Sequence, residues 1–582
     1  MRKQQVLVLL GILLFFYFVI LFYASSSLSV TPKIDEKVKY KQVNSASSPY
    51  VFDRPSIAEK VLNLLDVPEP VPKDYFNNDN PPVPRFQEGY LSLTWNENYC
   101  KEVHHYLALR SDEVFRQAHF FSDRYGHVRR IMKGFGVDIM PEIREYMEDQ
   151  DIRKYDLKPN IHNFFVSGPM HKYQLVGQSF ACTFQAYDHI PGHALFNRKD
   201  LLSESVSTYS KKYIDRPHCF NFSNFFPETW LLHIKSQCID FFNNHFNTKE
   251  YFDLKAKYKI IYIRKLGKGP HLGEGVNPVN EEEEKAIREE YDNGRKCGEI
   301  KKNRIIQKFI YNPLLIDGRK MDFRVYMLIA SVNPLIAYYH DGYAKVSLTP
   351  YDVTSTEKST LITNVGFDEY LEQAAQGEKP LGMNAKQLRE AHFWSFERIQ
   401  EYLLKVGKIT DPNWLDNYLR PSFKKAFIHL LRATSGPFVK FSQTYELVGA
   451  DFMLDDDLNL WIIECNTKPR LQPYTMVYKS DREPFFSVIS DEFDIVFALA
   501  RSRLKRAIKY INKIVNDLGD IGNDDPVELS DLEEKIQEFR EITKNRFEPE
   551  FQPKPFNTFS KFVDENLEGP ERYAGLIEPD CL

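Results

Sequence analysis

The chain has 582 residues, which at roughly 150 residues per domain gives a soft expectation of about four structural units. Its composition is 43% hydrophobic and 27% charged, which is typical of a globular protein and excludes a largely disordered one. Lys and Arg number 76 against 81 Asp and Glu, so the net charge is −5. This balance argues against nucleic-acid binding through a broadly basic surface, and we expect no nucleic-acid partner.

An unbroken apolar run from Val6 to Ala24 follows Arg2 and Lys3. The run is long enough to cross a bilayer as a helix, so we expect residues 1–24 to be a transmembrane signal anchor. A signal peptide cleaved near Ala24 is the alternative. Two Lys or Arg residues precede the run and four follow it within about 20 residues, which predicts a single-pass membrane protein with its large domain in the cytosol.

The rest of the chain divides by composition. Residues 25–89 are rich in Ser and then Pro, which predicts a tether. We expect residues 90–240 to form the N-terminal and central α/β lobes of the ligase. Strand-like runs and helices over 241–515 predict the catalytic region, and 516–582 predict a charged helix and a surface tail. Strands are expected at 304–310, 323–332, 335–339, 450–454 and 460–465, and helices at 56–65, after 284, at 486–515 and at 528–545.

Cysteine is sparse. The seven cysteines stand at positions 100, 182, 219, 238, 297, 465 and 581. The count is odd and no Cys-x-x-Cys pair occurs, so the sequence predicts neither a disulfide framework nor a zinc site. We expect reduced, mostly buried thiols in a reducing compartment.

A first candidate motif is the apolar strand from Ile261 to Lys265, which is followed by a loop with glycines at 267, 269, 273 and 275. Glycines let backbone amides approach phosphate oxygens, and the Lys supplies a positive charge. The motif is neither a P-loop nor a dinucleotide-binding fingerprint, and a flexible surface hairpin is the alternative.

A second motif places Asp322 and Arg324 in alternation with Phe323 and Val325. Because side chains alternate across a strand, the acid and the Arg share one face while the apolar residues pack on the other. A structural ion pair is the alternative to a chemical role.

A third motif is a hairpin with Asp451 on one strand and Glu464 and Asn466 on the next. Two carboxylates and an amide oxygen on one face form a site for a hard cation, and Mg²⁺ shared with substrate phosphates fits best. The run 455–457 is interpreted as the turn alone.

In this order, the motifs resemble the tubulin–tyrosine ligase-like family over roughly residues 175–510. The resemblance rests on Lys265, Gln307–Lys308, Gly318–Arg324, Asp451 and Glu464–Pro469, with support from Asn197–Leu202 and Phe225–Trp230. It implies an ATP-grasp fold of class α+β, in which two lobes enclose ATP. The family uses ATP to activate a protein carboxylate, which the amine of an amino acid then attacks, so positioning and charge neutralisation matter most.

The resemblance also implies the role of each site residue. Arg324, Asp322 and Lys345 would be catalytic, with Lys345 standing where the family usually has Arg. Asp451, Glu464 and Asn466 would hold Mg²⁺. ATP would be bound by Lys199, Lys265, Gln307, Lys308, Phe309, Ile310, Thr363 and Asn364, the last two in a segment that lacks the family's usual His.

The expected function is ligation of an amino acid to tubulin tails, with polyglutamylation ahead of glycylation and tyrosination. The expected partners are tubulin or microtubules, free glutamate and the membrane, for a monomer associated with the cytoskeleton or cilia. The alternatives are a membrane-tethered pseudoligase that binds ATP or microtubules without turnover, and an ATP-grasp ligase for a small molecule.

Overall fold

The computed structural model describes short segments at 118–122, 137–139, 165–167 and 186–187, most of residues 190–499, and residues 558–582. Within 190–499 the gaps are 191–192, 222–223, 267–274, 301–302, 333, 364, 437, 439–443, 468, 470–487, 489–490, 493–494 and 497–498. The expected anchor, the tether and the helices at 56–65 and 528–545 lie outside the described residues. The described part of 486–499 is helical, as expected.

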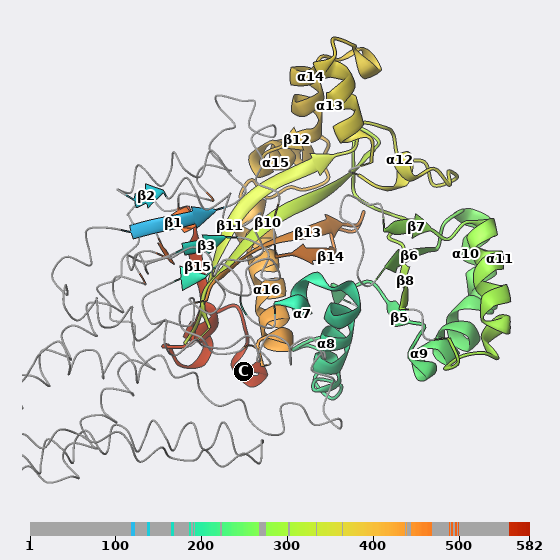
Figure 1. The fold of residues 1–582 in the computed structure, drawn as a ribbon, viewed down its shortest axis with the longest axis horizontal. Helices are drawn as coiled ribbons and strands as arrows, with labels where there is room; N and C mark the ends of the chain where they lie inside the picture. The colour runs from blue at the N-terminus through green and yellow to red at the C-terminus, as the bar shows by residue number, and fades with distance from the viewer. Residues whose placement is uncertain are drawn as a thin grey trace, which may run out of the picture.

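A large antiparallel sheet forms the centre of the described fold (Figure 1). Its strand order is β12-β11-β10-β13-β14, with β9 paired to β10 and β15 paired to β11. The strands are β9 (Leu315–Ile316), β10 (Arg319–Val332), β11 (Leu335–Val346), β12 (Phe393–Trp394), β13 (Glu446–Leu454), β14 (Leu460–Asn466) and β15 (Ser560–Asp564). Each run expected here as a strand is one, because β-branched and aromatic residues favour strands, and β10 and β13 are buried along almost their whole length.

The main core lies between this sheet and helix α16 (Arg420–Thr434). Phe323 of β10 and Phe452 of β13 meet Phe423 of α16 edge to face, with ring centroids 5.5 and 4.9 Å apart. These rings occupy one face of the strands. The alternate residues of β10 are therefore left for the opposite face of the sheet.

Further helices surround the large sheet (Figure 1). α13 and α14 lie beyond β12, and α7 and α8 lie beside β14. Their bounds are α7 (Ala194–Asn197), α8 (Lys199–Lys211), α12 (Lys358–Leu361), α13 (Phe367–Ala375), η7 (Pro380–Gly382), α14 (Ala385–His392), α15 (Phe396–Lys405), η8 (Leu415–Leu419), η10 (Gly569–Tyr573) and η11 (Pro579–Cys581).

A smaller antiparallel sheet, of order β5-β8-β6-β7, forms a second lobe. Aromatic side chains such as Phe241, Phe246 and Tyr262 pack between this sheet and its helices. Asn280 caps α11 and four glutamates fill its first turn, where the positive end of the helix dipole favours them. The elements are β5 (Thr229–Leu231), α9 (Lys235–Asp240), η5 (Phe241–Phe246), α10 (Lys249–Lys257), β6 (Tyr262–Leu266), β7 (Val276–Pro278), α11 (Glu281–Glu290), η6 (Asp292–Gly294) and β8 (Arg304–Lys308).

Four short parallel strands make a third sheet of order β2-β1-β3-β4. They are β1 (Ala118–Ser122), β2 (Val137–Ile139), β3 (Phe165–Ser167) and β4 (Ala186–Tyr187). The described chain therefore mixes helices with parallel and antiparallel sheets. Among its described residues, no helix combines the length and the apolar character that crossing a membrane requires.

The expectation of a surface tail is wrong for residues 558–582. β15 adds a strand to β11 of the large sheet, and Phe562 and Val563 are buried in the main core. The charged and Pro-rich composition around this segment hid a five-residue strand whose partner in the large sheet, β11, lies far away in the sequence.

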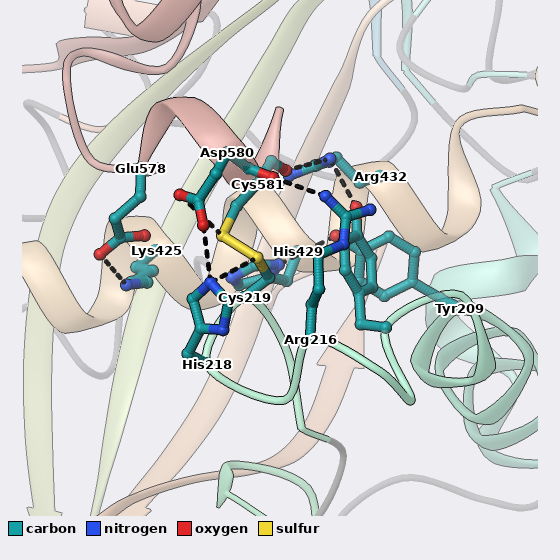
Figure 2. Close-up of a disulfide and its surroundings, with 11 residues drawn as sticks. Tyr209, Arg216, His218, Cys219, Lys425, His429, Arg432, Glu578, Asp580 and Cys581 are labelled. Atoms are coloured by element: carbon teal, nitrogen blue, oxygen red, sulfur yellow. Dashed lines mark hydrogen bonds and ion pairs between the residues drawn. A yellow bond between two sulfur atoms is a disulfide. The ribbon is translucent and has the colours of Figure 1, made fainter.

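The expectation of reduced cysteines is also wrong for the described residues. Cys219 is bonded to Cys581, and Cys238 is bonded to Cys297 (Figure 2 shows the first pair). Cys465 is the one free cysteine among the described residues, and it is buried. The partners lie 362 and 59 residues apart, so no local spacing in the sequence could reveal them.

Candidate active site

A row of charged residues crosses the face of the large sheet opposite α16. In the strand register, Lys345 of β11 lies opposite Asp322 of β10, and Arg324 of β10 lies opposite Asp451 of β13. Asp451 in turn lies opposite Glu464 of β14. Residues paired across strands share a face, so the register brings together side chains that are up to about 140 positions apart in sequence. The sequence-predicted catalytic and metal residues therefore form one cluster.

Ion pairs link the members of this row. The Arg324 guanidinium donates from Nε to Asp451 Oδ1 at 2.6 Å and from Nη2 to Oδ2 at 3.0 Å. Lys345 Nζ lies 2.8 Å from Asp322 Oδ1 and 3.3 Å from Asp451 Oδ1. All four residues are at most 9% exposed. Removing charged side chains from water is costly, and ion pairs offset part of that cost. Each of these four side chains has a partner of opposite charge.

The two aspartates have opposite pKa shifts. Burial and the neighbouring Asp451 raise the pKa of Asp322, although Lys345 opposes them. Burial alone would also raise the pKa of Asp451, but Arg324 and Lys345 lower it to about 2. Asp451 therefore stays ionised and can serve as a cation ligand at any physiological pH.

The expected metal ligands fit a hard cation. Asp451 and Glu464 are direct cross-strand neighbours, and Asn466 donates from Nδ2 to Glu464 Oε1 at 3.2 Å. Lys199, the first residue of α8, places Nζ 3.2 Å from Glu464 Oε2. Burial would raise the pKa of Glu464, yet Lys199 keeps it below its usual range. Two ionised carboxylates and an amide offer oxygen donors alone, which is the donor set that suits Mg²⁺.

The run 455–457 forms the turn, as expected. The Asp455 carboxylate accepts hydrogen bonds from the backbone amides of Asp457 and Asn459 and from the indole of Trp461. These local bonds occupy its oxygens and stabilise the hairpin between β13 and β14.

The second lobe contributes Lys265 from β6. Its ammonium donates to the backbone carbonyl of Ile463 on β14 at 3.3 Å, so the two sheets meet here. Burial and the positive charge of Lys199 lower its pKa to about 8. Because burial and a neighbouring positive charge lower this pKa, a bound anion would be favourable here. Phosphate oxygens would raise the pKa again and keep the ammonium charged.

Lys320 is a further cation of this cluster, and no role was expected for it. Burial and Lys265 lower its pKa to about 7, although Asp322 opposes them. Its ammonium donates to the Leu361 carbonyl at 2.9 Å and lies 4.4 Å from the centre of the Phe309 ring. The signal was present, because Lys320 stands two residues before Asp322 and shares its strand face.

The segment Gln307–Ile310, which was expected to bind ATP, is only partly turned toward this cluster. Register places Gln307 beside Ile263 and on the same face as Lys265, where its amide donates to the Thr229 hydroxyl at 2.8 Å. Phe309 packs with Ile263 and Leu361 in an apolar cluster. Lys308, in contrast, is about a third exposed and pairs with Glu228.

The remaining expected residues are placed as follows. Ile310 is half-buried two residues after the end of β8, and Thr363 is buried. Asn364 and the glycine-rich loop at 267–274 lie outside the described residues.

Comparison with known protein families identifies the chain. A model of the tubulin-tyrosine ligase family matches residues 178–500, which is more than half of the chain and includes every residue of the site. The chain belongs to this family.

Several curated members of the tubulin-tyrosine ligase family are similar to the chain. The human inactive polyglycylase TTLL10 is 26% identical over 313 residues, covering 52% of this chain and 43% of that protein. The Macaca fascicularis protein polyglycylase TTLL10 is 28% identical over 291 residues, covering 48% and 43%. The human tubulin monoglycylase TTLL3 is 32% identical over 174 residues, covering 30% and 21%. The chain thus spans less than half the length of these relatives.

Proposed function

We propose that the chain is an ATP-dependent ligase that forms an amide bond between an amino acid and a protein carboxylate. The observation that carries the proposal is the buried row of alternating charges on one sheet, which faces the buried Lys265 of the other sheet. A site that binds triphosphate, metal and two carboxylic acids must neutralise many negative charges in a dry cleft. The row supplies fixed charges of both signs for that task.

Each group has a role in this proposal. Lys199, Lys265 and Lys320 would hold phosphate oxygens, and the apolar cluster around Phe309 would receive the adenine ring. Asp451, Glu464 and Asn466 would hold Mg²⁺, which neutralises phosphate charge when bound. These residues form a nucleotide site between the two sheets, as in an ATP-grasp fold.

The reaction needs charge stabilisation more than a nucleophilic side chain. An oxygen of the acceptor carboxylate takes the terminal phosphoryl group of ATP, and ADP leaves. The amine of the amino acid then attacks the acyl carbon and displaces phosphate. Arg324, fixed by two hydrogen bonds to Asp451, is preorganised to stabilise negative charge at the reacting carboxyl. Lys345 would bind a carboxylate that is present throughout.

Glycine replaces glutamate as the first expectation for the amino acid. The names of the similar proteins TTLL10 and TTLL3 are those of glycylases, and none of the three relatives described above is named a glutamylase. A tubulin tail is the acceptor that the family name and the TTLL3 name suggest.

The test is mass spectrometry of acceptor peptides after incubation with the purified chain, Mg-ATP and one amino acid at a time. The acceptors are tubulin tails and a synthetic polyglutamate peptide, and the amino acids are glycine, glutamate and tyrosine. We expect glycine adducts on glutamate side chains, and Glu464→Gln as a control without activity. Glutamate adducts alone would replace the glycine assignment.

A pseudoligase that binds ATP or microtubules without turnover is the second candidate. The similar human TTLL10 is named inactive, and Lys345 stands where the family usually has Arg. Nucleotide binding without transfer of any amino acid to any acceptor would select this candidate.

A further inference from the structure

The described cysteines are almost all oxidised. Cys219–Cys581 and Cys238–Cys297 account for four of the five cysteines in the described residues, and all four are at most 6% exposed. The Cα atoms of the two pairs are 5.2 and 5.6 Å apart, within the range that a disulfide needs without moving the backbone.

The two disulfides lie in different lobes. Cys238–Cys297 joins α9 to the turn after η6 in the small lobe, and Cys219–Cys581 joins η11 to the loop after α8 beside the main core. Neither includes a residue of the candidate active site. Reactive and redox-sensing cysteines are partly exposed, whereas these four are buried, which is typical of structural disulfides.

The segment around Cys581 is docked by more than its disulfide (Figure 2). The Arg432 guanidinium donates to the Cys581 carbonyl at 2.8 Å, and the Arg216 guanidinium donates to the Asp580 carbonyl at 2.6 Å. His218 Nε2 lies 2.7 Å from Asp580 Oδ2. Polar groups from two distant segments thus hold η11 where the two sulfur atoms meet, so the fold itself brings the pair together.

Bound metal is the competing explanation for one pair only. His218, Cys219, Asp580 and Cys581 place one ligand atom each within 4.8 Å of one another. Among the described residues, no comparable group of ligands surrounds Cys238 and Cys297. An oxidising environment explains both pairs at once, whereas zinc would leave the second pair unexplained.

We propose that the catalytic region folds and acts in the secretory pathway or outside the cell, and that its acceptor is a carboxylate-bearing segment of a secreted or membrane protein in that compartment. Structural disulfides form and persist there and are rare in the cytosol. This inference rests on the proposed ligase function and replaces tubulin as the acceptor. It also requires Mg-ATP in the same compartment.

The apolar run at 6–24 is compatible with a catalytic region on the lumenal or extracellular side of the membrane. A cleaved signal peptide would export the domain, and an anchor with Arg2 and Lys3 in the cytosol would export it too. The Lys and Arg count after the run favours the opposite orientation, but two buried disulfides in separate lobes outweigh that small difference. Cys465, the unpaired thiol, is buried and has a raised pKa, so it resists oxidation.

Thiol counting tests the oxidation state in cells. The full chain is expressed in cultured cells, quenched in acid, denatured and alkylated with a polyethylene-glycol maleimide without reduction. If the pair is a disulfide, Cys581→Ser frees Cys219 and adds one modified thiol. The double variant Cys219→Ser/Cys581→Ser then returns to the wild-type count. Cys297→Ser repeats the test in the other lobe.

A change in the number of modified thiols in the opposite direction would overturn the proposal. If the thiols are reduced in wild type, Cys581→Ser and Cys297→Ser each remove one modified thiol. Loss of one thiol in Cys581→Ser together with zinc in the purified wild-type chain, measured by emission spectrometry, would assign a metal site instead. Neither reading depends on enzymatic activity.

A latency assay tests the acceptor's compartment. Sealed microsomes from the same cells receive labelled glycine, Mg-ATP and a synthetic polyglutamate peptide, with or without detergent. We expect peptide labelling only with detergent, and protection of the domain from added protease without it. Equal labelling in sealed vesicles would overturn the compartment inference, whereas protease protection with no labelling in detergent would count against the ligase function alone.

Discussion

Removing Arg324 should leave a buried carboxylate without its main partner. Asp451 is 5% exposed, and Arg324 holds it through two hydrogen bonds of 2.6 and 3.0 Å. Breaking a buried ion pair by removing one partner costs about 3–5 kcal/mol of the free energy of unfolding. Lys345 Nζ stays 3.3 Å from the same carboxylate, so we expect Arg324→Ala to lie at the lower end, about 3 kcal/mol.

Differential scanning calorimetry without nucleotide measures this loss. For domains of 150–250 residues, 1 kcal/mol shifts the Tm by roughly 2–4 °C, so the expected fall is about 6–12 °C. Because the folded pKa of Asp451 is about 2, below its ordinary value, its stabilising contribution is complete above about pH 4 and is lost as the pH falls toward 2. Scans at pH 7 therefore record the full effect, and the deficit of Arg324→Ala should shrink in acid.

A double-mutant cycle identifies the cause. Asp451→Asn should also lower the Tm, but Arg324→Ala/Asp451→Asn should cost less than the two single changes together, by about 0.5–3 kcal/mol. Additive losses, or a fall below about 3 °C for Arg324→Ala, would refute the ion-pair reasoning. In the proposed ligase, the same variant should reduce turnover on the order of 100-fold, because a preorganised charge is lost.

Three further outcomes follow from the site, and a fourth follows from the N-terminal apolar run. Millimolar Mg-ATP should raise the Tm of the purified chain by linkage, and Glu464→Gln should abolish that rise, as read by calorimetry with and without nucleotide. Mg-ATP affinity should fall by up to about tenfold from pH 7 to 8 and by up to about fiftyfold from pH 8 to 9, because Lys320 and Lys265 have pKa values of about 7 and 8 and must both regain their charge to bind phosphate. The accompanying proton uptake should be measurable by titration calorimetry, and an affinity independent of pH would contradict this role. Lys345→Ala should raise the apparent KM for a carboxylate substrate in steady-state kinetics, while Lys345→Arg should keep or improve activity by offering a bidentate donor. Deleting residues 1–24 should move the chain from the membrane pellet to the supernatant on ultracentrifugation.

Much of the large sheet and of the charged row was readable from the sequence. Side chains alternate along a strand whatever surrounds it, so Asp322 and Arg324 had to share a face, and so did Glu464 and Asn466. The turn at 455–457 was equally local, because a short acidic run between two apolar strands can satisfy its own backbone amides. These features depend on neighbours within a few residues, so short sequence motifs were enough to predict them.

Other features were decided by tertiary structure alone. Whether Asp451 would face Arg324 depends on the register between β10 and β13, and the distance from Lys265 to Ile463 depends on how the two lobes meet. Cys219 and Cys581 are separated by 362 residues, and nothing near either one marks its partner. A pairing between distant residues is set by the packing of everything between them, so local sequence determines the chemistry of each group while the tertiary fold determines its partner.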